Sequence, residues 1–161
     1  MRIDYPVTAA VRQLRENRVD FVPHIYTYVE HGGTRISAEA LGVPEHQVIK
    51  TIVLQTDEKQ PLIVLMHGDL EVSTKQLARI IGARHIELCT ADVARKHTGY
   101  EFGGTSPFGT RKKLPMYAEK TIFDLRRIHI NGGKRGFLVE IDPAELKRVL
   151  GAVEVDVGLR E

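Results

Sequence analysis

Apolar and polar residues alternate along the N-terminal half in patterns that predict both helices and strands. Apolar residues at helical spacing predict a first helix over 6–18. Segment 21–29 is rich in β-branched and aromatic residues, which predicts a strand, and Pro23 favours an edge position for it. Segments 48–56 and 61–68 are strongly apolar and flank a short polar turn. They predict a hairpin at the centre of a sheet.

Two short helices are predicted around these strands from their capping residues. Ser37 can cap a helix that ends before Gly42. Ser73 or Thr74 can cap another, which ends before Gly82.

The C-terminal half continues the alternation of strands and helices. The predicted strands cover 85–89, 116–123, 126–131 and 152–157, and the predicted helices cover 91–97 and 143–150. The glycine pair Gly132–Gly133 predicts the turn of a further hairpin. Many strands with interspersed helices indicate a mixed α/β fold, with a largely antiparallel, barrel-like sheet and flanking helices.

Composition narrows this picture to one ordinary globular domain. The 161 residues favour a single domain over 1–161, and 42% hydrophobic with 27% charged residues allows a core without metals or disulfides. Cys89 is the only cysteine, so no internal disulfide forms and a reducing cytoplasm is expected. No apolar run approaches the ~20 residues that span a bilayer, so no membrane association is expected.

Lys50 is an exception to the apolar pattern of its strand. Strand alternation places it on the same face as Val48, Ile52 and Leu54. One interpretation is an amine that extends along the sheet edge to water. The other is an ammonium directed into a cleft, where it holds a phosphate or polarises a carbonyl.

The segment TGYEFGGTSPFGTRKKLP (98–115) fits neither a helix nor a strand. Gly103–Gly104 can expose consecutive backbone N–H groups, which suit an oxyanion or a phosphate. Pro107 stiffens the turn and Phe108 can line a pocket. We interpret the segment as the wall of a binding site, although a tight structural connection would use glycine in the same way.

Basic residues lie in two glycine-rich loops, although the net charge is only +2. If the fold joins the two groups, they form a phosphate-binding surface; otherwise they are two solvated loops. The residues are Arg111, Lys112, Lys113, Lys134 and Arg135.

The histidines and the cysteine show no pattern typical of a metal site or a nucleophile. The seven histidines give neither H-x-H nor H-E-x-x-H spacing, so no metal and no cofactor is expected. Cys89 lies in an apolar stretch and is interpreted as a packed side chain. The sequence therefore offers a lysine and peptide donors, but no evident protein nucleophile.

Three motifs taken together resemble the YbaK/EbsC family, the free-standing homologues of the editing domain in bacterial prolyl-tRNA synthetase. They are VIKT (48–51), the 98–115 segment and INGGKRG (130–136), and the resemblance covers nearly the whole chain. It implies the YbaK/prolyl-tRNA synthetase editing-domain fold and a trans-editing deacylase, closest to the Cys-tRNA(Pro) branch. It also suggests mischarged tRNA as substrate and transient association with prolyl-tRNA synthetase.

The resemblance assigns roles to particular residues. Lys50 matches the signature functional lysine, and Gly103 and Gly104 match the glycines beside the ester carbonyl and terminal adenosine. The implied substrate-binding residues are Tyr26, Thr51, Thr105, Ser106, Pro107, Phe108, Asn131, Gly132 and Gly133. The five basic residues named above would hold the tRNA.

The chemistry implied for the Cys-specific branch is substrate-assisted: the thiol of the substrate attacks its own carbonyl, in a lyase-like cyclisation. Two alternatives stay open. One is a deacylase for another misacylated tRNA, such as Ala-tRNA(Pro), and the other is a nucleotide- or RNA-binding module without catalysis.

Overall fold

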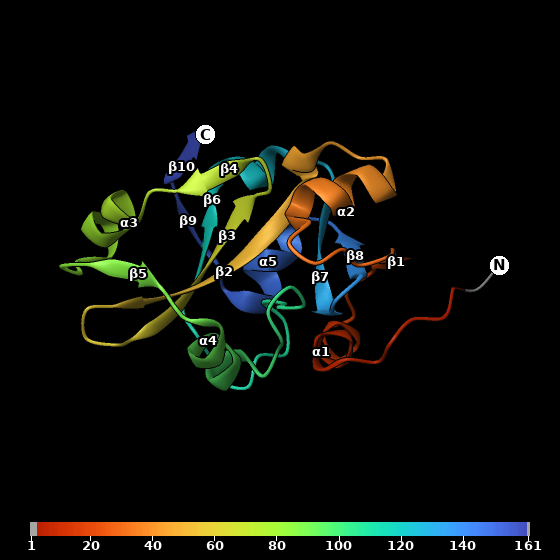
Figure 1. The fold of residues 1–161 in the computed structure, drawn as a ribbon, viewed down its shortest axis with the longest axis horizontal. Helices are drawn as coiled ribbons and strands as arrows, with labels where there is room; N and C mark the ends of the chain where they lie inside the picture. Colours follow the sequence, from red (N-terminus) through yellow and green to blue (C-terminus); the bar gives the residue numbers. More distant parts are fainter. Residues whose placement is uncertain (1–2, 161) are drawn as a thin grey trace.

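The structure, a computed structural model, describes residues 3–160 and is built on an eight-stranded sheet (Figure 1). Along the sheet the order is β1 (Val22–Ile25), β8 (Phe137–Ile141), β7 (Ile128–Lys134), β2 (Val48–Thr56), β3 (Pro61–His67), β6 (Met116–Glu119) and β9 (Val153–Val155). The short strand β5 (Ile86–Leu88) pairs with the end of β2, and β4 (Leu70–Val72) pairs with β10 (Gly158–Arg160) in a separate ribbon.

Strand pairing is mixed, with antiparallel pairs in the majority. The β2–β3 hairpin is antiparallel and lies at the middle of the sheet, which confirms the prediction from the two strongest apolar runs. The pairs β2–β7, β3–β6 and β6–β9 are parallel. The mixed α/β class predicted from the sequence is therefore confirmed.

Helices cover both faces of the sheet (Figure 1). They are α1 (Ala9–Glu16), α2 (Gly33–Leu41), α3 (Thr74–Ile81), α4 (Ala91–Thr98) and α5 (Ala144–Leu150). Helix α1 buries its apolar stripe in the main core with Ile130 and Phe137, whereas α2 packs Ala38 against Val48 and Leu138. No helix within residues 3–160 is long and apolar enough to span a bilayer.

Helix α2 begins earlier than the predicted cap at Ser37. It starts at Gly33, and its N-cap, Gly32, makes no side-chain hydrogen bond. Ser37 is buried inside the helix, where its hydroxyl donates to the carbonyl oxygen of Thr34 at 3.1 Å. The prediction was wrong because a serine hydroxyl can bond back within a helix as well as cap one. Ser73, by contrast, caps α3 through the Gln76 amide as predicted.

The predicted strand over 116–123 is also too long. Strand β6 ends at Glu119, and a 3₁₀ helix, η2, follows over Lys120–Asp124. The Glu119 carboxylate accepts hydrogen bonds from the amides of Val157 and Gly158 at 2.7 and 2.9 Å. These contacts join β6 to a segment that is distant in the sequence. The residues around β6 therefore could not predict where the strand ends.

The predicted turn at Gly132–Gly133 lies inside strand β7, which continues to Lys134. The pairing with β8 shifts register between Asn131 and Lys134. The Asn131 side-chain oxygen accepts from the amides of Gly133 and Lys134 at 2.6 and 3.1 Å, so it replaces a strand partner across the bulge. Strand β1 occupies a sheet edge, as Pro23 predicted, although it is shorter than 21–29.

Candidate active site

A cavity of about 470 Å³ lies where strands β2 and β7 separate. The two strands pair in parallel only at Val48–Ile49 with His129–Ile130. Among residues 3–160, the next strand to pair on that side of β2 is β5, at Leu54. The gap between these pairings is lined by β2, by segment 102–105, and by the segment that leads into α2. The cavity is thus a product of sheet topology.

Most of the surface that lines the cavity is apolar, although polar side chains also contribute to its wall. The apolar side chains are Val29, Ile36, Val48, Ile49, Ile52, Phe102 and Leu138. The sequence-predicted residues that line it are Tyr26, Lys50, Thr51, Gly103, Thr105 and Asn131. An apolar pocket with a few placed polar groups is typical of a small-molecule site.

Lys50 lines the cavity and is held at its far end by β4. Its ammonium donates to the carbonyl oxygen of Leu70 at 2.5 Å and lies 3.6 Å from the Glu71 carboxylate. The Lys50 side chain is only 22% exposed, so the charge is positioned rather than free in solvent. The sequence could not predict this, because the apolar face of β2 contains no partner for an ammonium.

Thr51 contributes a second polar group with an unusual environment. Its hydroxyl oxygen is buried and has no hydrogen-bond partner among residues 3–160. Buried hydroxyls normally have a partner, since an unsatisfied one is costly. Thr51 lines the cavity, but its buried hydroxyl oxygen is not accessible from it.

The two glycines of the predicted diglycine corner occupy different positions. Gly103 lines the cavity, and within residues 3–160 its amide has no hydrogen-bond partner. The Gly104 amide instead donates to the carbonyl oxygen of Glu101 at 2.9 Å, which closes a turn. Gly104 is buried against the backbone of Lys134 and Arg135. The geometry therefore leaves one amide of the pair available, where the sequence predicted two.

Ser106, Pro107 and Phe108 are buried beneath the loop and do not line the cavity. Phe108 is fully buried in the main core, and its amide donates to the Ser106 hydroxyl at 3.1 Å. The Tyr100 hydroxyl donates to the Phe108 carbonyl oxygen at 2.5 Å. These contacts anchor the loop, so the aromatic ring that sequence placed in the pocket instead fixes the loop to the core.

Gly132 and Gly133 also lie outside the cavity wall and permit close packing. A Cβ on Gly132 would collide with the Phe137 ring, and one on Gly133 would lie 2.9 Å from the Tyr100 ring. Asn131, which lines the cavity, donates to the Gly103 carbonyl oxygen at 3.2 Å. This bond joins the bulge of β7 to the 98–115 segment, which we call the glycine loop.

The five predicted basic residues are all exposed. Arg135 belongs to the cavity rim: its Nε donates to the Phe102 carbonyl oxygen at 2.8 Å, and its guanidinium lies 5.2 Å from the centre of the Tyr28 ring. Lys112 lies 3.1 Å from the imidazole of His97. Arg111 is packed beside Gly99. Arg135, from one basic group, therefore contacts the first part of the 98–115 segment, whereas the other group, 111–113, lies in its last part.

Several lining residues were not predicted as site residues. Most of them come from the segment before α2 and from the first turns of that helix. They are Tyr28, Val29, His31, Gly33, Thr34, Ile36 and Ser37, together with Phe102 from the glycine loop. His31 has φ of 62°, a left-handed conformation that non-glycine residues rarely adopt. In the sequence, the available signal was the glycine pair Gly32–Gly33 directly after His31. Tyr26, which also lines the cavity, is partly buried, and this burial raises the pKa of its hydroxyl.

A concave, mostly apolar site at a strand separation, with one fixed ammonium and one available amide, is typical of a small-molecule binding site. Comparison with known proteins identifies the family to which the chain belongs. The family model described as the aminoacyl-tRNA editing domain matches residues 34–149, and the chain belongs to this family. That range includes Lys50, the glycine loop and Asn131.

Individual relatives agree with the family. The chain is 26% identical over 155 residues to an Enterococcus faecalis protein provisionally named Cys-tRNA(Pro)/Cys-tRNA(Cys) deacylase EbsC, covering 96% of this chain and 94% of that one. It is 30% identical over 132 residues to the proline–tRNA ligase of Thermodesulfovibrio yellowstonii, covering 78% of this chain but 23% of the ligase. A solved structure provisionally described as a trans-editing enzyme for prolyl-tRNA synthetase shares the fold, with a TM-score of 0.82 at 22% identity and 99% coverage of both chains.

Proposed function

We propose that this protein is a trans-editing deacylase that cleaves the ester of mischarged Cys-tRNA(Pro), and also of Cys-tRNA(Cys). The observation that carries the proposal is the cavity between β2 and β7, which has Lys50 and Gly103 in its wall and lies within the family match. Its mostly apolar lining suits a small aminoacyl group. The likeness to EbsC over nearly the full length of both chains supports the cysteinyl substrate.

The reaction that we propose is assisted by the substrate. The cysteinyl sulfur forms a bond to its own carbonyl carbon, and the ester C–O bond then breaks. A cyclic thiolactone and the tRNA are released, and the tRNA hydroxyl takes up the proton that the thiol lost. No protein nucleophile is needed. Cys89 is not part of the cavity wall, and burial raises the pKa of its thiol, which disfavours the reactive thiolate.

In this reaction the protein positions the substrate ester and stabilises the negative charge that develops on it. The Gly103 amide is assigned to the oxygen that becomes negative in the tetrahedral intermediate. Lys50 adds positive potential beside it and contacts the phosphate or hydroxyls of the terminal nucleotide. One such preorganised donor is worth on the order of 3 kcal/mol of transition-state stabilisation. Gly104 is no longer assigned to the oxyanion, because its amide closes the turn to Glu101.

The tRNA body is assigned to the exposed basic residues of the 98–115 and 130–136 segments. Phosphate contacts of this kind fix position and carry little sequence information. Because the net charge is only +2, tRNA identity is expected to come from a partner such as prolyl-tRNA synthetase in the cytoplasm. The relation to proline–tRNA ligases supports that choice of partner.

A panel of aminoacyl-tRNAs tests the substrate and the chemistry together. Purified protein is incubated under single-turnover conditions with Cys-tRNA(Pro), Ser-tRNA(Pro) and Ala-tRNA(Pro), and the remaining ester and the thiolactone are quantified. We expect rapid loss of the cysteinyl ester only, with thiolactone as product. Comparable loss of the alanyl ester would exclude thiol assistance and favour an activated water. Absence of deacylation with every substrate would favour a non-catalytic RNA-binding module.

A further inference from the structure

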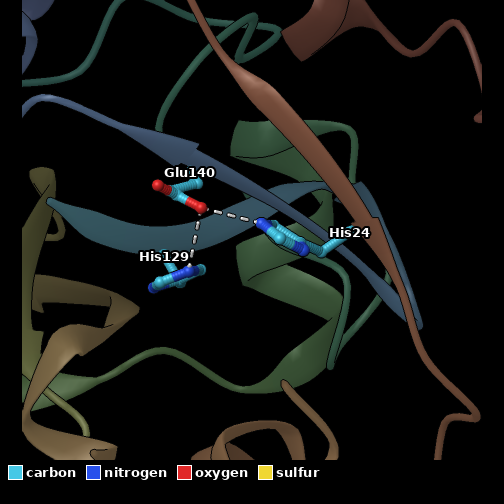
Figure 2. A group of neighbouring side chains, drawn as sticks. All are labelled: His24, His129 and Glu140. Carbon is cyan, nitrogen blue, oxygen red and sulfur yellow. Dashed lines mark hydrogen bonds and ion pairs between the residues drawn. The ribbon is translucent and has the colours of Figure 1, made fainter. Parts of the chain in front are cut away.

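Three potential metal ligands converge from three adjacent strands: His24 of β1, His129 of β7 and Glu140 of β8 (Figure 2). Both imidazoles direct Nε2 at the same carboxylate oxygen of Glu140, at 2.9 Å for His24 and 3.5 Å for His129. The two imidazole ring centres are 5.2 Å apart. The three ligand atoms all lie within 4.8 Å of one another.

Strand register explains why these side chains share a face. His129 is directly opposite Glu140, and His24 is opposite Leu138, two residues before Glu140. Residues two apart on a strand point the same way, so all three side chains project from one side of the sheet. The intervening residues Ile128, Ile130, Val139 and Ile141 fill the main core on the other side.

The set of donors suits a divalent transition metal. Two imidazoles and one carboxylate, with a position left open, form a recurrent zinc ligand set. Bond lengths of about 2.0–2.1 Å place two ligands of a tetrahedral ion about 3.3 Å apart. The observed separations of 2.9 and 3.5 Å fall on either side of that spacing.

His129 is poorly satisfied by hydrogen bonds, which is the second observation. Its side chain is 6% exposed, and Nε2, not the Nδ1 that is unpartnered among residues 3–160, is the nitrogen that faces Glu140. Its Nε2 faces Glu140 only at the long distance of 3.5 Å. Buried imidazoles usually have a partner at hydrogen-bond distance, or a metal.

Arg127 is the charged neighbour that must be considered. Its Nε donates to the other carboxylate oxygen of Glu140 at 3.1 Å, and its Nη2 donates to the backbone carbonyl oxygen of Glu140 at 3.2 Å. The contact engages only the oxygen that does not face the imidazoles, and it fixes the plane of the carboxylate, as outer partners of metal ligands do. Its positive charge also opposes a cation, so we expect modest affinity.

A second group of potential ligands, His46, His67 and Asp69, provides a comparison. Both ring nitrogens of His67 are already bonded, to the His46 carbonyl oxygen and to the Thr121 hydroxyl, at 2.7 Å each. His67 therefore has no nitrogen for a metal. This group serves as the control for the first.

We propose that His24, His129 and Glu140 bind one divalent transition-metal ion of the zinc class, which ties the edge strand β1 to β7 across β8. The site adjoins the cavity, because Leu138 and Asn131 of its wall are each two residues from a ligand. The ion takes no part in the proposed deacylation, and this inference does not rest on that function. Spacing along the chain could not predict the site, since its ligands meet only through strand pairing.

Metal titration of the full-length protein tests the proposal. After chelator treatment and removal of the chelator, Co²⁺ is titrated near neutral pH and its visible d–d absorption is followed, and Zn²⁺ binding is measured by calorimetry. We expect one ion per chain, a Co²⁺ band typical of four or five ligands, and a Tm that rises with Zn²⁺ concentration.

Matched variants identify the ligands. In His24→Ala and Glu140→Gln, we expect affinity to fall more than about tenfold and the Zn²⁺-dependent rise in Tm to disappear. His46→Ala, which removes an imidazole from the comparison group, should bind as the wild type does. Circular dichroism checks that each variant is folded; His24 lies on an edge strand with a 30% exposed side chain, so its replacement should be tolerated. Absence of saturable binding, or equal affinity in His24→Ala, Glu140→Gln and wild type, would overturn the proposal.

Discussion

Gly103 and Tyr28 are packed so closely that a Cβ on Gly103 would lie 2.5 Å from the Tyr28 hydroxyl oxygen. The backbone of Gly103 also has φ of +87°, a conformation that costs other residues about 1–2 kcal/mol. Both residues line the cavity. The position of the Gly103 amide therefore depends on the absence of a side chain.

Gly103→Ala is expected to impair deacylation beyond its effect on stability. The new methyl must displace Tyr28 or the loop, and misplacing a catalytic donor by about 1 Å can cost about 10²-fold in rate. Gly151→Ala is the matched control, since Gly151 also has positive φ, of 64°, but would place its Cβ in open space. Both variants should lose stability by urea unfolding, Gly103→Ala more because of the contact with Tyr28, and only Gly103→Ala should lose kcat/KM. Equal activity in the two variants would remove Gly103 from the proposed site.

Lys50→Ala is expected to lower kcat/KM for Cys-tRNA(Pro) by about 10²-fold, because the positive potential beside the ester carbonyl is lost. The fold should persist, with a stability loss of about 1 kcal/mol for the missing hydrogen bond to Leu70. The control is Lys147→Ala, which removes another lysine that is paired with a glutamate, Glu154, at 2.7 Å. A folded Lys50→Ala protein with wild-type turnover would refute the role given to this lysine.

Lys113→Ala and Lys134→Ala are each expected to weaken tRNA binding by a similar factor for every tRNA sequence. Each phosphate contact that is lost should also reduce the slope of log K against log salt concentration by about one. Filter binding or fluorescence anisotropy at several salt concentrations measures both quantities. Lys75→Ala, which removes an exposed charge on α3 at the opposite end of the sheet from α1, should leave affinity and slope unchanged (Figure 1). Equal slopes in all three variants would contradict the assignment.

Acidification is expected to destabilise the protein, partly through His67. Burial is the main cause that lowers the pKa of His67, against opposing contributions from the His46 carbonyl, Asp69 and Glu119. The unfolded chain then binds more protons than the folded one as pH falls from about 6.5 to the lowered pKa, so stability falls over that interval. NMR titration should give His67 a midpoint below the ordinary histidine value of about 6.5.

The contribution of His67 to acid sensitivity can be separated with a variant. His67→Gln should show a smaller difference in unfolding free energy between about pH 7 and pH 5.5 than the wild type. His85→Gln should retain the full difference, since the His85 side chain is 68% exposed. An unchanged difference in His67→Gln would show that other groups cause the acid sensitivity.

Local patterns were enough to predict the fold class, the central β2–β3 hairpin and several helix ends. Strand alternation and helical spacing involve near neighbours only, and Gly42 and Gly82, both in a left-handed conformation, end α2 and α3 as predicted. Helix α5 also ends at Leu150 as predicted, whereas α4 runs to Thr98, one residue past its predicted end. The motifs at 48–51, 98–115 and 130–136 contain Lys50, Gly103 and Asn131, which all line the cavity. Lys50 was noticed because it interrupts an apolar strand face and Gly103 because glycine permits special backbone geometry, whereas Asn131 was named only through the family resemblance.

Which of those residues share a cavity depends on contacts between segments that are far apart in the sequence. Phe108 and Ser106 point into the core because the loop needs an anchor, and the Gly104 amide is consumed by a turn. Tyr28 and the first turn of α2 enter the site because β2 and β7 separate beside them. His24, His129 and Glu140 meet for a similar reason: contacts between strands depend on register, and register depends on the whole sheet rather than on neighbouring residues.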